Sequence, residues 1–335
     1  MLTAPRSLDA GLGLCPSAPH RALLGLLRVA LDGPGEGPDS AALVADLRAS
    51  SPETIVQLAF DASLHVVLAS AFDRDPALRS AVPRDLIVFS QEMRAANLRR
   101  NQEIHAQLLE IGVAFAQAGL RGVALKGAAE LLCPVYPDPG LRFLSDIDIL
   151  LPADDVTRAS QCLLDIGAVP DPEAQAELIG HHHEAPLGRP DWPVAVELHR
   201  AVGHGPAAAR LLPPADLLGA AVATAETGLS VPAPAHRLAH AVLHAQYHGP
   251  CQRCRLLSPR DAMEFHVLSL GCAAREAEAA RVRFAVGPDR IAWDALDAGA
   301  AGPWAILELA LGRRGGVPPP QENTRVATWG RWVWP

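Results

Sequence analysis

The chain has 335 residues, 49% of them hydrophobic, which is enough for two or three domains or one large one, with a sizeable core. The net charge of −8 and the lack of a long lysine and arginine run disfavour a nucleic-acid-tracking protein, although a local basic cleft could still accept RNA. There is no run of about 18 apolar residues and no basic-then-apolar start, so we expect no membrane span and no secretory signal. We therefore expect a cytoplasmic protein with reduced thiols.

The first part of the chain has a helical pattern. Leucine and valine recur at helical spacing from His20 to about Ser90, and Ser51 is expected to cap a helix that begins at Pro52. Residues 84–118 predict one long helix or two, with Gly119 just past the end.

The middle of the chain alternates between strand and helix patterns. Strands are expected at 122–125, 143–151, 178–187 and 194–199, and helices are expected from 128 and over 153–166, the latter ended by Gly167. This order predicts a small mixed sheet covered by helices, and hence an α+β fold. After Ala201 the pattern is helical again to about Leu270. We therefore expect a helical region at 1–100, a core at 101–200 and a second helical region at 201–335.

Two aspartates mark the expected strand at 143–151. Because strand side chains alternate between faces, Asp146 and Asp148 point to the same side. Two adjacent carboxylates on a covered strand repel each other unless a cation lies between them, and Mg²⁺ suits carboxylates together with triphosphate oxygens. The alternative is a solvated strand edge, which the flanking Ile147 and Ile149 disfavour.

A third acid lies on the expected strand at 194–199. Glu197 shares a face with His199, and if the two strands are neighbours it completes a cluster that can hold two cations around an α-phosphate. In that cluster Glu197 could be a metal ligand or the general base for an acceptor hydroxyl. The alternative is a surface glutamate on an edge strand.

Positively charged residues precede the aspartates. Lys126 and Gly127 form a strand-to-helix turn at which a phosphate could bind, since glycine allows close backbone approach and a helix N-terminus favours anions. Arg142 is a second candidate for contacting the triphosphate, or else an ordinary loop arginine.

Taken in order, these motifs resemble the bacterial "uncharacterised nucleotidyltransferase" family of the DNA polymerase β-like superfamily. The resemblance rests on Leu125-Lys126-Gly127, Tyr136, Arg142, Asp146-Ile147-Asp148-Ile149-Leu150, Gly167 and Glu197-Leu198-His199. It implies two Mg²⁺ ions, or Mn²⁺ in their place, held by Asp146, Asp148 and Glu197, an NTP donor, and transfer of a nucleoside monophosphate to an acceptor. It also implies that Lys126 and Gly127 occupy the phosphate-binding turn, and we expect Arg142 and His199 to contact the nucleotide as well. The Lys-Gly turn departs from the superfamily's usual Gly-Ser, which puts the role of Lys126 in doubt.

A histidine series follows, at positions 236, 240, 244 and 248. These histidines either line the cleft beside the sheet or pack in the interior, while His244, His248, Cys251 and Cys254 have residue types and spacing that a zinc site can use. The His181–His183 run and Trp329, Trp332 and Trp334 have no assigned role, and the tryptophans could either stack on a base or dock on apolar surface.

Three functions from different classes follow. The first is a nucleotidyltransferase acting on a small-molecule, peptide or protein acceptor, with nucleic acid disfavoured. The second is a non-catalytic nucleotide-binding or scaffold protein that keeps the fold, and the third is a zinc-bearing interaction protein. The retained acids favour the first.

Overall fold

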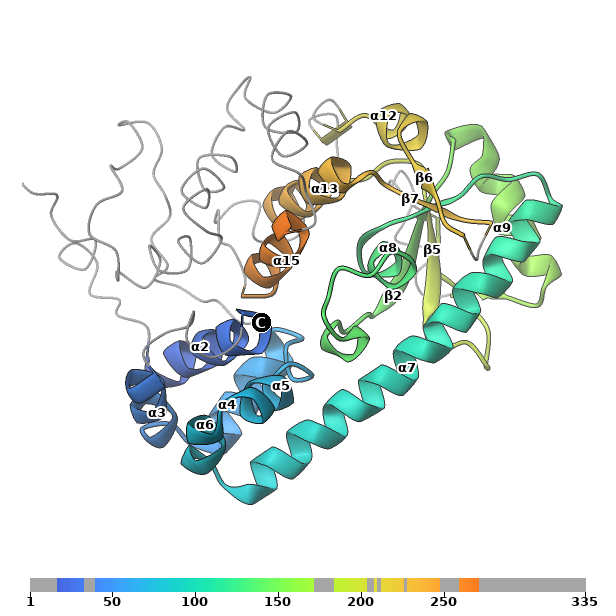
Figure 1. The fold of residues 1–335 in the computed structure, drawn as a ribbon. Coiled ribbons are helices and arrows are strands. Elements are labelled where there is room, and N and C mark those ends of the chain that lie inside the picture. Colours follow the sequence, from blue (N-terminus) through green and yellow to red (C-terminus); the bar gives the residue numbers. More distant parts are fainter. Residues whose placement is uncertain are drawn as a thin grey trace, which may run out of the picture. The chain divides into compact units, whose positions relative to one another are not determined.

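The computed structural model describes residues 17–32, 40–171, 184–203, 208–209, 212–225, 228–247 and 259–270. These segments form two compact units (Figure 1). The first contains the described parts of 1–95 and 249–270, and the second contains those of 96–248. The boundary between the units falls inside one helix. The division into three regions at residues 100 and 200 stays a prediction.

The first unit is helical, as the sequence pattern predicts. Ser51 caps α4 by accepting a hydrogen bond from the Thr54 backbone nitrogen at 3.1 Å, with Pro52 in the first turn. Helix α2 packs against α3, α4 and α5, and Leu26 and Leu27 on it are fully buried. The helices of this unit are α2 (Ala18–Asp32), α3 (Ser40–Arg48), α4 (Pro52–Asp61), α5 (Leu68–Arg74), α6 (Pro76–Ala81), the start of α7 (Arg84–Gln117) and α15 (Pro259–Leu270).

Helix α7 is one continuous helix of 34 residues rather than two. It ends before Gly119, whose φ of +68° is a conformation that glycine adopts without strain. Its second half belongs to the second unit, and the apolar side chains on one face of that half, such as Ile104 and Leu108, are fully buried. Within the described part of the chain, no helix is both long enough and apolar enough to cross a bilayer.

The second unit is built on a mixed sheet with the order β3-β4-β5-β2-β1-β7-β6. The β2–β5 and β1–β7 pairs are parallel, and the remaining pairs are antiparallel. This confirms the expected α+β fold with a mixed sheet. The strands are β1 (Val123–Ala124), β2 (Asp146–Leu150), β3 (Val169–Pro170), β4 (Leu187–Gly188), β5 (Ala195–His199), β6 (Val222–Ala223) and β7 (Ser230–Val231).

One face of the sheet is covered by helices and forms the core. Ile147 and Ile149 of β2 and Val196 and Leu198 of β5 are all fully buried. They pack with apolar residues of α7 and of α9 (Val156–Asp165), which follows the short 3-10 turn η2 (Ala153–Asp155). The core comprises Ile104, Leu108, Ile111, Phe115, Leu120, Ala124, Ala128, Leu144, Ile147, Ile149, Leu151, Val156, Ala159, Leu163, Ala168, Leu187, Trp192, Val194, Val196, Leu198 and Leu229. The carboxylates on the same two strands therefore alternate to the other side.

Strand β2 begins at Asp146, three residues later than the pattern predicts, because side chains of α7 hold the preceding segment. The buried Asn97 and Asn101 both donate to the Arg142 carbonyl, at 3.0 and 2.8 Å, and Arg100 donates to the Leu144 carbonyl at 2.5 Å. These bonds satisfy backbone oxygens that would otherwise accept hydrogen bonds from the N–H groups of a neighbouring strand. They also fix the segment after the 3-10 turn η1 (Pro139–Leu141).

The prediction of helix throughout 201–270 is wrong for one segment. Strands β6 and β7 pair at one end of the sheet, between α12 (Pro214–Gly219) and α13 (Pro234–Tyr247). Each is two residues long, too short for a period of two to be visible in the sequence.

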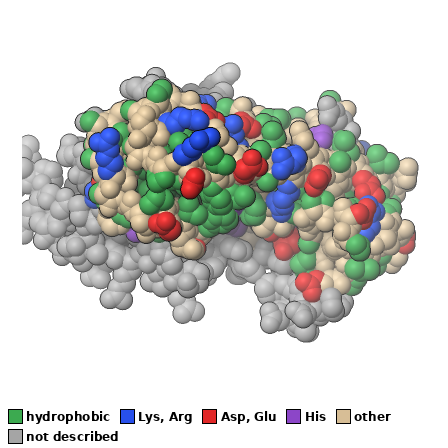
Figure 2. All heavy atoms as spheres, turned by 90° about the horizontal axis from the view of Figure 1, so that it is seen from below, with side chains coloured by type: hydrophobic (Ala, Val, Ile, Leu, Met, Phe, Trp, Pro, Cys, Tyr) green, Lys and Arg blue, Asp and Glu red, His purple; other side chains and the backbone are tan. Residues whose placement is uncertain are grey.

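On the face drawn in Figure 2, acidic and basic side chains are interspersed, with no continuous basic stripe among the described residues.

Candidate metal and nucleotide site

The pairing of β2 with β5 brings two of the predicted acids, Asp148 and Glu197, side by side. The two parallel strands run in register, with Asp148 beside Glu197 and Asp146 beside Ala195. Paired residues on neighbouring strands project to the same face. Asp146, Asp148, Glu197 and His199 therefore share the face opposite the buried isoleucines, and the expectation that these strands are neighbours is confirmed.

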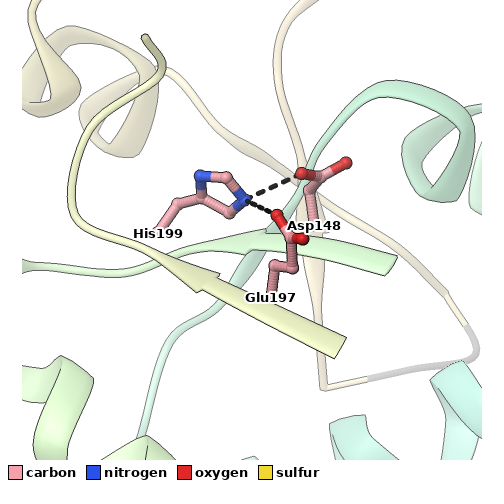
Figure 3. Close-up of side chains that lie close together, drawn as sticks. All are labelled: Asp148, Glu197 and His199. Atoms are coloured by element: carbon pink, nitrogen blue, oxygen red, sulfur yellow. Dashed lines mark ion pairs between the residues drawn. The ribbon is translucent and has the colours of Figure 1, made fainter. Parts of the chain in front are cut away.

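Three of these side chains form a compact cluster (Figure 3). Nε2 of His199 lies 2.7 Å from Oδ1 of Asp148 and 3.4 Å from Oε2 of Glu197. One ligand atom from each residue lies within 4.8 Å of the others, close enough for a single ion. The Asp148 and His199 side chains are 2% and 3% exposed, whereas that of Glu197 is 22% exposed. Glu197 is thus the member of the cluster that reaches solvent.

Lys126 provides a positive charge for Asp148. Its Nζ lies 2.9 Å from Asp148 Oδ1. Burial raises the pKa of Asp148, but Lys126 and His199 more than offset this and hold that pKa well below its usual range. Burial lowers the pKa of Lys126, and Asp148 more than offsets it, so that this pKa is raised. The backbone φ of Lys126 is +47°, a strained region for a residue with a side chain.

Asp146 is in the opposite situation. Its pKa is raised by burial first, and next by the Asp148 carboxylate, and the effect of Lys126 is too small to reverse this. The charged form of Asp146 is therefore disfavoured without a further cation. A divalent ion beside these carboxylates would supply that charge, and carboxylates are ligands that Mg²⁺ and Mn²⁺ accept. The chemistry of the donor set therefore fits such an ion.

His199 is basic despite its burial. Burial lowers its pKa, but hydrogen bonds with Asp148 and Glu197 more than offset this, and the pKa is raised. The proton favoured at Nε2 occupies the lone pair that an imidazole offers to a metal. The sequence assigns His199 to nucleotide binding, whereas the geometry also makes it a candidate metal ligand.

A family model described as "Uncharacterised nucleotidyltransferase" matches residues 49–270. The chain belongs to this family. No curated protein and no solved structure matches it. The match extends over described parts of both compact units and contains every candidate site residue named above.

Lys126 begins α8 (Lys126–Leu132) and Gly127 follows it. A Cβ on Gly127 would lie 2.7 Å from Cγ of Leu144, closer than carbon atoms approach in proteins. Packing against Leu144 is thus a sufficient reason for glycine here, and the positive φ belongs to Lys126. The place of Gly127 in a phosphate-binding turn stays a prediction.

Arg142 lies in the interior of the second unit, where it is 4% exposed. Its Nε donates to Oε2 of Glu130 at 2.9 Å, and its Nη1 donates to the Phe143 carbonyl. This buried ion pair joins α8 to the segment before β2, which is a structural role. Contact of Arg142 with a triphosphate stays a prediction.

Two further residues lie near the site, Arg100, which the sequence did not single out, and His240, which belongs to the histidine series noted in the sequence. Asp146 affects the pKa of Arg100, which is lowered mainly by burial, and Cζ of Arg100 lies 5.0 Å from the centre of the Phe143 ring. His240 on α13 is 3% exposed, and its pKa is lowered to about 3, first by burial and next by Lys126. The four-residue histidine spacing pointed to His240, whereas Arg100 gave no signal within a long charged helix.

Other predictions fall outside the described residues. Of the four residues considered for zinc, only His244 is described, and His248, Cys251 and Cys254 are not. The His181–His183 run and the three C-terminal tryptophans also lie outside the described part of the chain.

Proposed function

We propose that this protein is a metal-dependent nucleotidyltransferase that transfers a nucleoside monophosphate from an NTP to a small-molecule, peptide or protein acceptor. The observation that carries the proposal is the parallel, in-register pairing of β2 and β5, which places Asp148 beside Glu197 on one face. Membership of a nucleotidyltransferase family supports the class of reaction.

Asp146, Asp148 and Glu197 would hold the metal, with His199 as a further ligand. Bound there, a divalent cation supplies positive charge to the α-phosphate and to the leaving pyrophosphate. The face that carries these residues is partly buried, so the attraction between the cation and the phosphates is stronger than it would be in water. Lys126, already 2.9 Å from Asp148, adds a positive charge beside the same phosphates.

In the proposed reaction an oxygen of the acceptor attacks the α-phosphorus in line. A bond forms between that oxygen and phosphorus, and the bond from phosphorus to the bridging oxygen of the β-phosphate breaks, releasing pyrophosphate. A hydroxyl acceptor loses its proton. Glu197, the carboxylate of the cluster that reaches solvent, can accept that proton if it is not bound to metal. The acidic chain favours acceptors other than nucleic acid.

The test is incubation of the purified protein with each α-labelled NTP, Mg²⁺ or Mn²⁺, and acceptor pools of small molecules, peptides and proteins. Label should move to one pool, and the Asp146→Asn, Asp148→Asn double variant should lose at least about a hundredfold in rate. Asp154→Asn, which changes an exposed acid of η2, is the matched control and should keep the wild-type rate.

Two results would refute the proposal. Transfer that is unchanged in the double variant would show that these acids are not the site. Nucleotide binding by equilibrium dialysis, without transfer to any pool, would favour the non-catalytic nucleotide-binding alternative.

A further inference from the structure

Arg237 on α13 is a buried arginine with an incomplete set of partners. It is 8% exposed. Its Nη1 donates to the Cys133 carbonyl at the end of α8, at 3.2 Å. Its Nη2 is buried and has no hydrogen-bond partner among the described residues.

The buried Arg142 provides a contrast within the same unit. Arg142 is 4% exposed, and its charge is balanced by Glu130 at 2.9 Å. Arg237 has a carbonyl oxygen as its partner and, within the described part of the chain, no carboxylate. Burying a guanidinium without a counter-charge is costly, which is why removing one partner of a buried ion pair is strongly destabilising. An anion is therefore expected at Arg237 in the working protein.

The position of Arg237 relates it to the nucleotide site. His240 lies three residues further along α13 and so shares its helix face. His240 is 3% exposed, its Nε2 has no partner among the described residues, and Lys126, Asp148 and His199 all affect its pKa. Helix α13 also packs against α8, whose first residue is Lys126. The Arg237 face of α13 therefore borders the carboxylate cluster.

We propose that Arg237 binds the terminal phosphates of the NTP, the two that leave as pyrophosphate. This inference rests on the proposed function. A guanidinium offers paired N–H donors that match phosphate oxygens, and its charge does not depend on pH in the working range. Nη1 is fixed by Cys133, so the guanidinium is already oriented and Nη2 remains for the ligand. The hydrogen bond from Nη1 to the Cys133 carbonyl caps the C-terminus of α8, but this capping role gives no reason for burying Nη2.

The experiment compares nucleotides without turnover. Binding of a non-hydrolysable NTP analogue and of the matching NMP is measured by calorimetry with Mn²⁺ present. Arg237→Gln should weaken binding of the NTP analogue by about 10- to 100-fold and leave NMP binding within about twofold. The control is Arg158→Gln, which removes an arginine whose side chain is 60% exposed and paired with Asp155. It should change neither affinity.

Unchanged affinity for the analogue in Arg237→Gln, or equal losses for the analogue and NMP, would overturn the proposal. A third result would also overturn it: Arg237→Gln binds the NTP analogue and NMP as the wild type does, but its NMP complex binds added inorganic phosphate more weakly. That result would assign Arg237 to a phosphate on the acceptor. If Arg237→Gln does not fold, Arg237→Lys decides. Lysine keeps the charge but not the paired donors, so the same selective loss is expected, to a smaller degree.

A failure of the proposed function would look different. If the wild type binds neither the analogue nor NMP, tripolyphosphate alone decides the role of Arg237. Binding of tripolyphosphate that is lost in Arg237→Gln but kept in Arg158→Gln would support the anion site without the nucleotide. No binding to the wild type would overturn it.

Discussion

Nζ of Lys126 lies 2.9 Å from Oδ1 of Asp148, a carboxylate whose side chain is 2% exposed. The two residues come from different elements, the first turn of α8 and the middle of β2. The pair neutralises one of the two strand aspartates and leaves the other, Asp146, with a raised pKa. The protein therefore holds a balanced and an unbalanced carboxylate on the same face, and this asymmetry can be tested.

Asp148→Asn should lower the free energy of unfolding of the metal-free protein by about 3 kcal/mol, because Lys126 and His199 lose their common counter-charge. Urea denaturation would measure this. A carboxyl with a depressed folded pKa stabilises the fold above its unfolded pKa of about 3.9, and this is lost as pH falls further. The difference should thus be constant from pH 7 to about 5 and shrink below about 4. Combining Lys126→Met with Asp148→Asn should restore stability, because the unpaired lysine is then removed. If Asp154→Asn lowers the free energy of unfolding as much as Asp148→Asn does, Asp148 is not the counter-charge that stabilises the fold.

Asp146→Asn should have the opposite effect on the metal-free protein. The folded pKa of Asp146 is raised, so the residue stabilises the fold below its unfolded pKa and loses this contribution as pH rises through the folded pKa. At pH 7 the variant should therefore be more stable than wild type, by about 1.4 kcal/mol for each unit of pKa shift, and the gain should vanish below about pH 4. Saturating Mn²⁺ should reverse the order. If Mn²⁺ stabilises both proteins equally, Asp146 is not a ligand.

Glu197→Gln should weaken Mn²⁺ binding by at least about tenfold, because Glu197 is one of the three residues that can reach one ion. Electron paramagnetic resonance of free Mn²⁺ gives the affinity directly. Glu103→Gln on the exposed side of α7 is the matched control and should bind as wild type. Unchanged Mn²⁺ binding together with a hundredfold or larger loss of transfer would instead assign Glu197 the role of general base.

Gly127→Ala tests why glycine follows Lys126. A Cβ there would lie 2.7 Å from Cγ of Leu144, and the cost of overpacking, about 1–3 kcal/mol, should exceed the helix propensity gained by alanine. The substitution should therefore lower stability in the wild type and raise it in a Leu144→Ala background. Thermal unfolding of the four proteins completes the double-mutant cycle. A loss in both backgrounds would show that Leu144 is not the cause.

Local patterns determined much of the fold. Apolar spacing predicted the helices of the first unit, and the cap at Ser51 and the glycines after α7 and α9 are found as expected. Period-two alternation alone placed Asp146 and Asp148 on one face and Ile147 and Ile149 on the other. Such features depend on neighbours within a few residues, so the sequence carries them directly.

Other features required the tertiary structure. The sequence could state that Glu197 would join the aspartates if the strands were neighbours, and only the pairing of β2 with β5 across 49 positions, Asp148 to Glu197, decided it. Neither the His199 contact with Asp148 nor the ion pair of Arg142 with Glu130 has a local signature. The two-residue strands β6 and β7 have no visible period at all.

By itself the sequence therefore determined which residue types could do the chemistry and which way each faces along its own element. The tertiary structure decided which of them meet. The physical reason is that backbone geometry repeats within a few residues, whereas strand pairing and burial of charge depend on contacts between segments far apart in the chain. Arg142 and Arg237 illustrate this, since both are arginines in the sequence and only the fold shows that one has a carboxylate partner and the other has a carbonyl.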